Sequence, residues 1–80
     1  MITVTVKLYG TLPRRYPSYD FDKGLTIKLE QGACVADLTR KLHITAEDTG
    51  FIAMEGRVAR PHEPLCDGAL IRIFQVAHGG

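Results

Sequence analysis

The sequence predicts an α+β fold in which a mixed β-sheet carries one main helix packed on one face. Apolar and polar residues alternate over Ile2–Leu8 and again over Leu25–Leu29, which is typical of half-buried strands. The period changes to that of an amphipathic helix at Val35, and Leu70–Val76 is a final run that is apolar on both sides. A hairpin, a crossing helix and a returning strand give a mixed sheet, in which we expect the first and last strands to be neighbours.

Length and composition fit one globular domain of 80 residues, with 45% hydrophobic and 24% charged residues. The net charge is +1 and no basic stripe occurs, so we expect no nucleic-acid partner. The apolar runs are far shorter than a membrane span and the N-terminus lacks a signal-peptide layout, so we expect a cytoplasmic protein away from membranes. Cys34 and Cys66 form no CxxC pair and no spaced set with the histidines, which favours free thiols and no metal site.

The first two strands are close in sequence, so an antiparallel hairpin is the simplest pairing. The loop between them, Gly10–Gly24, contains two prolines and the adjacent cations Arg14 and Arg15, and we expect it to be exposed and irregular. The residues predicted to form one core between sheet and helix are Ile2, Val4, Val6, Leu8, Leu25, Ile27, Leu29, Val35, Leu38, Leu42, Ile71 and Ile73.

The middle of the chain is expected to form a helix and two short strands. Val35, Leu38 and Leu42 lie at i, i+3 and i+7, which predicts an amphipathic helix of about two turns. Cys34 precedes this helix at its N-cap, where a thiol is a poor capping group. Phe51–Met54 is expected to be a short strand and Arg57–Ala59 a brief edge strand.

The last five residues, Val76-Ala77-His78-Gly79-Gly80, are predicted to form an arm beyond the body, with a domain over 1–76 and a flexible tail over 77–80. Gly79 and Gly80 have no side chains, so the last peptide could enter a channel too narrow for any Cβ. Extended, five residues reach about 17 Å, which would place the Gly80 carboxylate inside another protein's active site. The alternative is a frayed chain end without a function.

The predicted order of elements, ending in Gly79-Gly80, resembles the ubiquitin-like β-grasp fold and, within it, the MoaD/ThiS family of sulfur carriers. The resemblance covers nearly the whole chain. The stretches that carry it are 32–38 at the helix start, 54–58 at the middle turn, and 65–71 running into Ile73-Phe74 and the terminal glycines. The chain departs from the family at Cys34, where Thr or Ser is common, and at Glu55, where Asn is frequent.

The resemblance implies a sulfur carrier rather than an enzyme. An adenylating enzyme related to the ubiquitin activators would join Gly80 to AMP, using ATP and Mg²⁺, and a persulfide would then displace AMP to leave a thiocarboxylate on Gly80. Gly79 would give the tail access to the partner's active site. The carrier itself would bind no cofactor, because its partners supply the catalytic groups. Those partners would be the adenylating enzyme and either a synthase large subunit that accepts the sulfur or a thiazole synthase.

Three further residues are candidates for partner binding. Phe74 and Val76 precede the arm on the strand face opposite Ile71 and Ile73, so they could dock on partners or could instead fill the core. His78 could help to orient the tail within a partner or could be an exposed linker residue.

The acceptor of the sulfur stays open at this point. The chain length and the long Gly10–Gly24 loop resemble the small subunit of molybdopterin synthase, and we favour a role in molybdopterin synthesis. The absence of Pro-Pro after Phe74 is more similar to the carrier for the thiazole of thiamine. A ubiquitin-like modifier of protein lysines and a plain binding module are the further alternatives.

Overall fold

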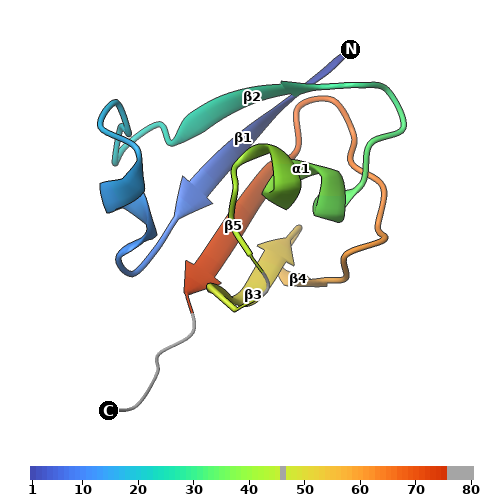
Figure 1. Ribbon diagram of the computed structural model, residues 1–80. Coiled ribbons are helices and arrows are strands. Elements are labelled where there is room, and N and C mark those ends of the chain that lie inside the picture. Colours follow the sequence, from blue (N-terminus) through green and yellow to red (C-terminus); the bar gives the residue numbers. More distant parts are fainter. Residues whose placement is uncertain (46, 76–80) are drawn as a thin grey trace.

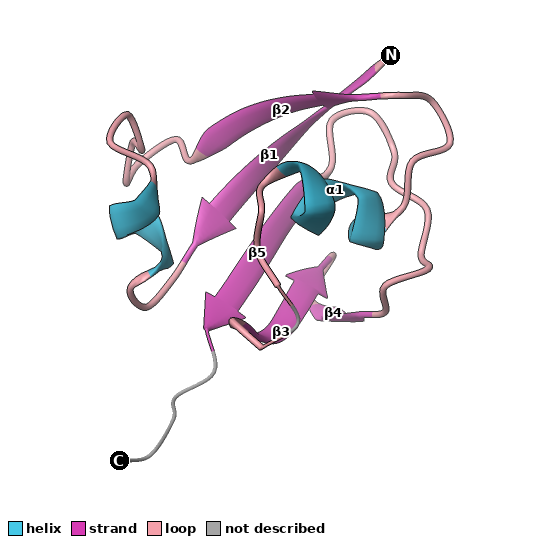
Figure 2. Cartoon of the chain, in the orientation of Figure 1, coloured by secondary structure: helices cyan, strands magenta, loops and turns pink. Residues whose placement is uncertain are grey.

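The computed structural model describes residues 1–45 and 47–75, which form a five-stranded mixed sheet and one α-helix (Figures 1 and 2). The predicted boundary between body and tail, at residues 76 and 77, lies outside the described residues. The elements in chain order are β1 (Ile2–Leu8), the 3₁₀ helix η1 (Leu12–Arg15), β2 (Leu25–Leu29), α1 (Val35–Lys41), β3 (Thr49–Met54), β4 (Arg57–Ala59) and β5 (Leu70–Gln75).

The strand order in the sheet is β2-β1-β5-β3-β4. β1 and β2 form the predicted antiparallel hairpin, with Val4 opposite Ile27. β1 and β5 are parallel neighbours at the centre, which confirms the expected pairing of the first and last strands. Figure 1 shows α1 lying across one face of the sheet, over the central strands. The predicted mixed sheet with one helix on one face is therefore confirmed.

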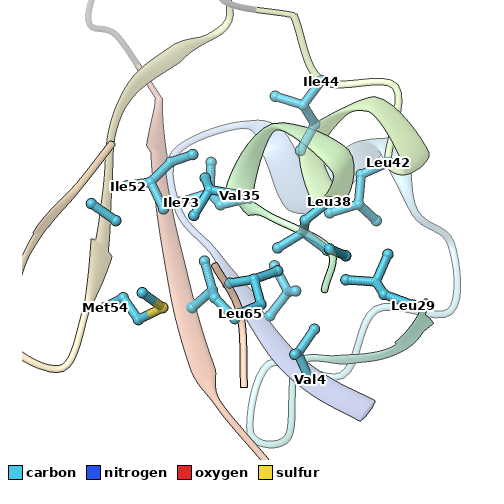
Figure 3. Close-up of a cluster of buried hydrophobic side chains, with 14 of the residues drawn as sticks. Val4, Leu29, Val35, Leu38, Leu42, Ile44, Ile52, Met54, Leu65 and Ile73 are labelled. Carbon is cyan, nitrogen blue, oxygen red and sulfur yellow. The ribbon is translucent and has the colours of Figure 1, made fainter. Parts of the chain in front are cut away.

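The core lies between α1 and the sheet, as Figure 3 shows for Val35 and Leu38 of the helix and Ile73 of β5. Ten of the twelve predicted core residues are buried, and the two that are not, Leu25 and Ile27, are only partly buried because β2 is an edge strand. The core also includes seven residues that the prediction lacked: Leu12, Ala33, Ile44, Ile52, Met54, Ala59 and Leu65.

The prediction of an exposed, irregular loop over Gly10–Gly24 was wrong in part. Its first turn forms η1, and Leu12 within it is fully buried in the core. The hydroxyl of Tyr16 donates to the carbonyl of Leu42, and the hydroxyl of Tyr19 accepts from the Leu8 amide at 2.8 Å. Two tyrosines therefore fasten the loop to the body, while Arg14 and Arg15 are exposed as expected.

Backbone amides at the start of α1 donate hydrogen bonds to acceptors that include carbonyls outside the helix. The backbone amide of Cys34 donates to the Asp37 carboxylate at 2.9 Å, and this bond is the main reason that the pKa of Asp37 is lowered. The amides of Val35 and Ala36 donate to the carbonyls of Glu63 and Pro61 at 3.0 and 2.8 Å. The segment before β5 thereby supplies acceptors for helix amides that would otherwise be unpaired.

The boundaries of the later strands differ a little from the prediction. β3 begins at Thr49 rather than at Phe51, and its pairing with β5 is irregular between these two residues. β5 is described as far as Gln75, and Val76 lies outside the described residues. In the part of the chain that the structure describes, no helix is long and apolar enough to cross a membrane.

Candidate functional site

Three aromatic rings stack on the sheet face opposite α1. Phe74 of β5 lies between Tyr9, which follows β1, and Phe51 of β3. The ring centroids are 4.5 Å and 4.4 Å apart, and the ring planes are inclined by 8° and 15°. Because Ile71 and Ile73 point into the core, the alternation of β5 places Phe74 on the other side of the sheet. We call Tyr9, Phe51 and Phe74 the aromatic patch.

The aromatic patch is accessible at the surface. The Phe51 residue is 46% exposed and Phe74 is half-buried between its two neighbouring rings. Stacked rings of this kind hold one another in place, so the patch presents a preformed apolar surface. Exposed apolar surface of this sort is suited to binding another protein.

The same sheet face is positively charged beside the aromatic patch. Strand alternation places Lys7, Lys28 and Arg72 on it, and Lys7 lies directly opposite Arg72 in the β1–β5 pair. The Nε of Arg72 donates to the Tyr9 hydroxyl at 3.2 Å, which joins the cations to the rings. All nine acidic residues belong to the described part of the chain, and all lie outside the five strands. Lys7, Lys28 and Arg72 take part in none of the three ion pairs found among the described residues, so the face combines an apolar centre with positive charge.

An ion pair braces the strand that carries Phe51. Arg15 in η1 forms a bidentate contact with Asp48, which directly precedes β3, at 3.0 and 3.1 Å. The Thr45 hydroxyl donates to the same carboxylate at 2.9 Å. The hydrogen bond from Arg15 is the main reason that the pKa of Asp48 is lowered, and its bond to Asp48 raises the pKa of Arg15. The loop after β1 and the connector before β3 are thus tied together beside the end of β5.

The structure describes only one of the predicted site residues. Phe74 lies on the face opposite Ile71 and Ile73, and its role in binding stays a prediction. Val76, His78, Gly79 and Gly80 lie outside the described residues. Sequence reasoning missed Tyr9 and Phe51 as members of the same surface. The one available signal was that Tyr9 continues the outward-facing side of the β1 alternation.

No metal centre accompanies this surface in the described residues. No group of three or more His, Cys, Asp or Glu side chains in them is placed to hold a metal ion. Cys34 and Cys66 are free thiols, of which Cys34 is half-buried and Cys66 is exposed.

The topology and the helix position define a ubiquitin-like β-grasp protein, as the sequence predicted. A protein from Pyrococcus furiosus assigned as molybdopterin converting factor, subunit 1, is 23% identical and matches with a TM-score of 0.76 over 96% of this chain and 100% of its own. A structure of SAMP1 from Haloferax volcanii is 17% identical, with a TM-score of 0.74 over 98% and 99% of the two chains.

A second structure from the same organism, of small archaeal modifier protein 1, is 14% identical, with a TM-score of 0.76 over 96% of this chain and 100% of its own. These likenesses confirm the predicted resemblance at the level of the fold. No protein-family model matches the chain, and no curated protein matches it significantly.

Proposed function

We propose that this chain is a sulfur carrier whose Gly80 carboxylate is adenylated and converted to a thiocarboxylate, which then donates its sulfur. The observation that carries the proposal is the sequence Gly79-Gly80, four and five positions after Gln75 of β5, on a β-grasp body. Two residues without side chains give the terminal carboxylate access to a narrow active site.

The proposed chemistry needs an activating partner, because a carboxylate is a poor acylating group. A Gly80 carboxylate oxygen attacks the α-phosphorus of Mg²⁺-bound ATP, and pyrophosphate leaves. A persulfide sulfur attacks the acyl carbon and AMP leaves. A thiol then attacks the partner's sulfur in the resulting acyl disulfide, which leaves a thiocarboxylate on Gly80 and a disulfide on the other side. These steps require a nucleophile, a metal site and an ATP site only on the partner.

The aromatic patch and the neighbouring cations are the surface that we propose for docking the adenylating enzyme and the sulfur acceptor. Phe74 lies one residue before the end of β5, so a partner seated on the patch would lie beside the start of the tail. Lys7, Lys28 and Arg72 favour a partner surface that places carboxylates around an apolar centre. Val76 and His78 would extend this contact along the tail.

For the sulfur acceptor we favour the molybdopterin pathway, with the large subunit of the synthase as partner and the cytoplasm as the compartment. The likeness to the P. furiosus protein supports this choice. A carrier for the thiazole of thiamine, working with a thiazole synthase, is the alternative.

The likeness to small archaeal modifier protein 1 favours a second candidate function, a ubiquitin-like modifier. Both functions share the adenylation step. A modifier would afterwards be found joined to lysines of other proteins, whereas a carrier would not.

Intact-mass spectrometry tests the carrier function directly. With an activating enzyme of the ubiquitin-activator class from the same organism, ATP, Mg²⁺ and a persulfide donor, the mass of the chain should rise by about 16 Da as sulfur replaces oxygen. The proposal fails if an enzyme shown to be active leaves the mass unchanged.

Replacing Phe74 by alanine should weaken binding to the activating enzyme by about 1–2 kcal/mol, because it removes the middle ring of the stack. The fold should stay largely intact, since Phe74 lies outside the buried core. Calorimetric titration measures the affinity, and thermal unfolding measures the stability. Phe21→Ala is the matched control, because Phe21 is 77% exposed and lies outside the patch. A large loss of stability with unchanged affinity would make Phe74 a structural residue.

Reversing the charge of Lys7 should slow association with the same enzyme. Lys7→Glu removes positive charge from the proposed docking face and adds negative charge. The effect on the association rate should be large at low salt and fade near 1 M salt, where the Debye length is about 3 Å. Arg40→Glu makes the same change of charge on α1. Equal effects of the two variants, measured by stopped-flow at several salt concentrations, would show that the sheet face has no special role.

A further inference from the structure

The end of β5 is held by a side-chain clamp from the loop that follows β1. The Oε1 atom of Gln75 accepts two hydrogen bonds, from the backbone amide of Thr11 at 2.7 Å and from its hydroxyl at 2.8 Å. Two residues earlier on the same edge, the amide of Tyr9 donates to the carbonyl of Ile73 at 3.1 Å. Both groups of Thr11 thus converge on one atom of the last described residue of the strand.

Two glycines let the surrounding backbone close on this point. Gly10 has a φ of +74°, and a Cβ added to it would lie 2.5 Å from Gln75 Oε1. On the opposite side, β3 approaches so closely that a Cβ on Gly50 would lie 3.0 Å from the Phe74 carbonyl oxygen. The clamp, consisting of Gly10, Thr11, Gly50 and Gln75, therefore grips the strand from both neighbours.

We infer that Gln75 is a positioning residue that fixes the point from which the tail reaches its partner. This inference rests on the proposed function, because the residues that follow Gln75 are the ones that would enter the activating enzyme. Without Gln75, water would accept the hydrogen bonds from the amide and the hydroxyl of Thr11, because Thr11 is exposed, so fold stability alone does not call for a glutamine here. The glutamine is needed instead for the proposed activity. Residues 76–80 can bring Gly80 to the partner's active site reproducibly only if Gln75, from which they extend, is held in place.

The physical reason is conformational entropy. Fixing the backbone of one residue corresponds to a factor of about 5 to 30 in an equilibrium constant. With the clamp intact, Gln75 is already ordered before the partner binds. Without it, Gln75 keeps its backbone pairing with β3 but loses its tie to the loop after β1, and this part of its order must be gained during binding. This loss of entropy weakens binding and leaves the rate of the chemical step unchanged, because the tail of the bound variant has the same geometry as the tail of the bound native chain.

Gln75→Ala should therefore raise the KM of the chain in ATP–pyrophosphate exchange about 5- to 30-fold and leave kcat near the native value. The assay uses the full chain with the activating enzyme, ATP and Mg²⁺. Gln75→Glu replaces the amide oxygen by a carboxylate oxygen that can accept both bonds, and it should keep KM within about twofold of native. Thr11→Val loses one of the two bonds and should show an intermediate rise of about two- to tenfold.

A matched control lies at the other end of the same strand pair. Asp67 Oδ1 accepts from the amide of Thr3 at 2.7 Å, across the same separation of 64 positions that joins Gln75 to Thr11. Asp67→Ala removes a comparable side-chain acceptor far from the tail, and it should leave KM unchanged. Hydrogen exchange checks the clamp itself, because the Thr11 amide should lose protection in Gln75→Ala and keep it in Gln75→Glu.

The outcomes separate this inference from the proposed function. If the native chain is activated and Gln75→Ala has the native KM, the positioning role is overturned and the carrier function stands. Equal rises in KM for Gln75→Ala and Asp67→Ala would also overturn it, because both would then reflect general loosening of the fold. If the native chain is not activated by an enzyme of proven activity, the proposed function is overturned and the positioning role with it.

Discussion

Deleting Gly79 and Gly80 should abolish the mass increase of about 16 Da and leave the free energy of unfolding nearly unchanged. The described core is complete without these residues, since every buried side chain lies at or before Ile73. The shortened chain would still carry the aromatic patch, and so it should still bind the activating enzyme and compete with the native chain. Urea unfolding, a competition assay and intact-mass spectrometry measure the three expectations.

Lengthening is the control for the deletion. One extra residue after Gly80 keeps both glycines but moves the carboxylate beyond the reach for which the activating site is built, so it should also abolish the mass increase. Sulfur uptake by the deleted chain equal to that of the native chain would contradict the carrier function. It would move attention to the free thiols of Cys34 and Cys66.

Replacing Leu38 by alanine should lower the free energy of unfolding by about 2–5 kcal/mol. Leu38 is fully buried and lies at the centre of the contact between α1 and the sheet, as Figure 3 shows. The substitution removes apolar contacts and leaves a cavity that a short helix packed on a small sheet can close only in part. For a domain of this size such a loss is a large share of the total stability.

Arg40→Ala is the matched control, because Arg40 lies on the same helix with its side chain 77% exposed. It should change the free energy of unfolding by no more than about 0.5 kcal/mol. Urea unfolding of both variants measures the difference. A Leu38→Ala variant as stable as the native protein would contradict the packing of α1 described above.

The fold could be predicted from the sequence wherever apolar side chains recur at the regular spacing of a strand or a helix. β1, β2 and α1 each repeat an apolar position at the spacing of one strand or helix face, so their bounds and buried sides followed directly. Leu12 could not be predicted as core in the same way, because it is one apolar residue between turn signals. Its burial depends on hydrogen bonds of Tyr16 and Tyr19 to parts of the body that only the tertiary structure brings near.

The sequence could predict only those residues of the candidate site that lie close together along the chain. The two glycines and Phe74 are readable from the end of the sequence alone. The stack of Tyr9 on Phe74 requires β1 and β5 to be neighbours, and the stack of Phe51 requires the β3–β5 register, which the irregularity near Thr49 shifts. Likewise, the bond from Thr11 to Gln75 joins residues 64 positions apart and has no signature in the linear sequence.

The aromatic patch takes one ring from near the start of the chain, one from the middle and one from near the end. Pairing of this kind, between strands distant in sequence, is completed late and slowly when a chain folds. A chain in which β5 has not yet docked beside β1 has no stacked rings to offer. If, as we propose, the partner binds this patch before it adenylates the tail, it would use ATP only on molecules in which β5 has already paired with β1.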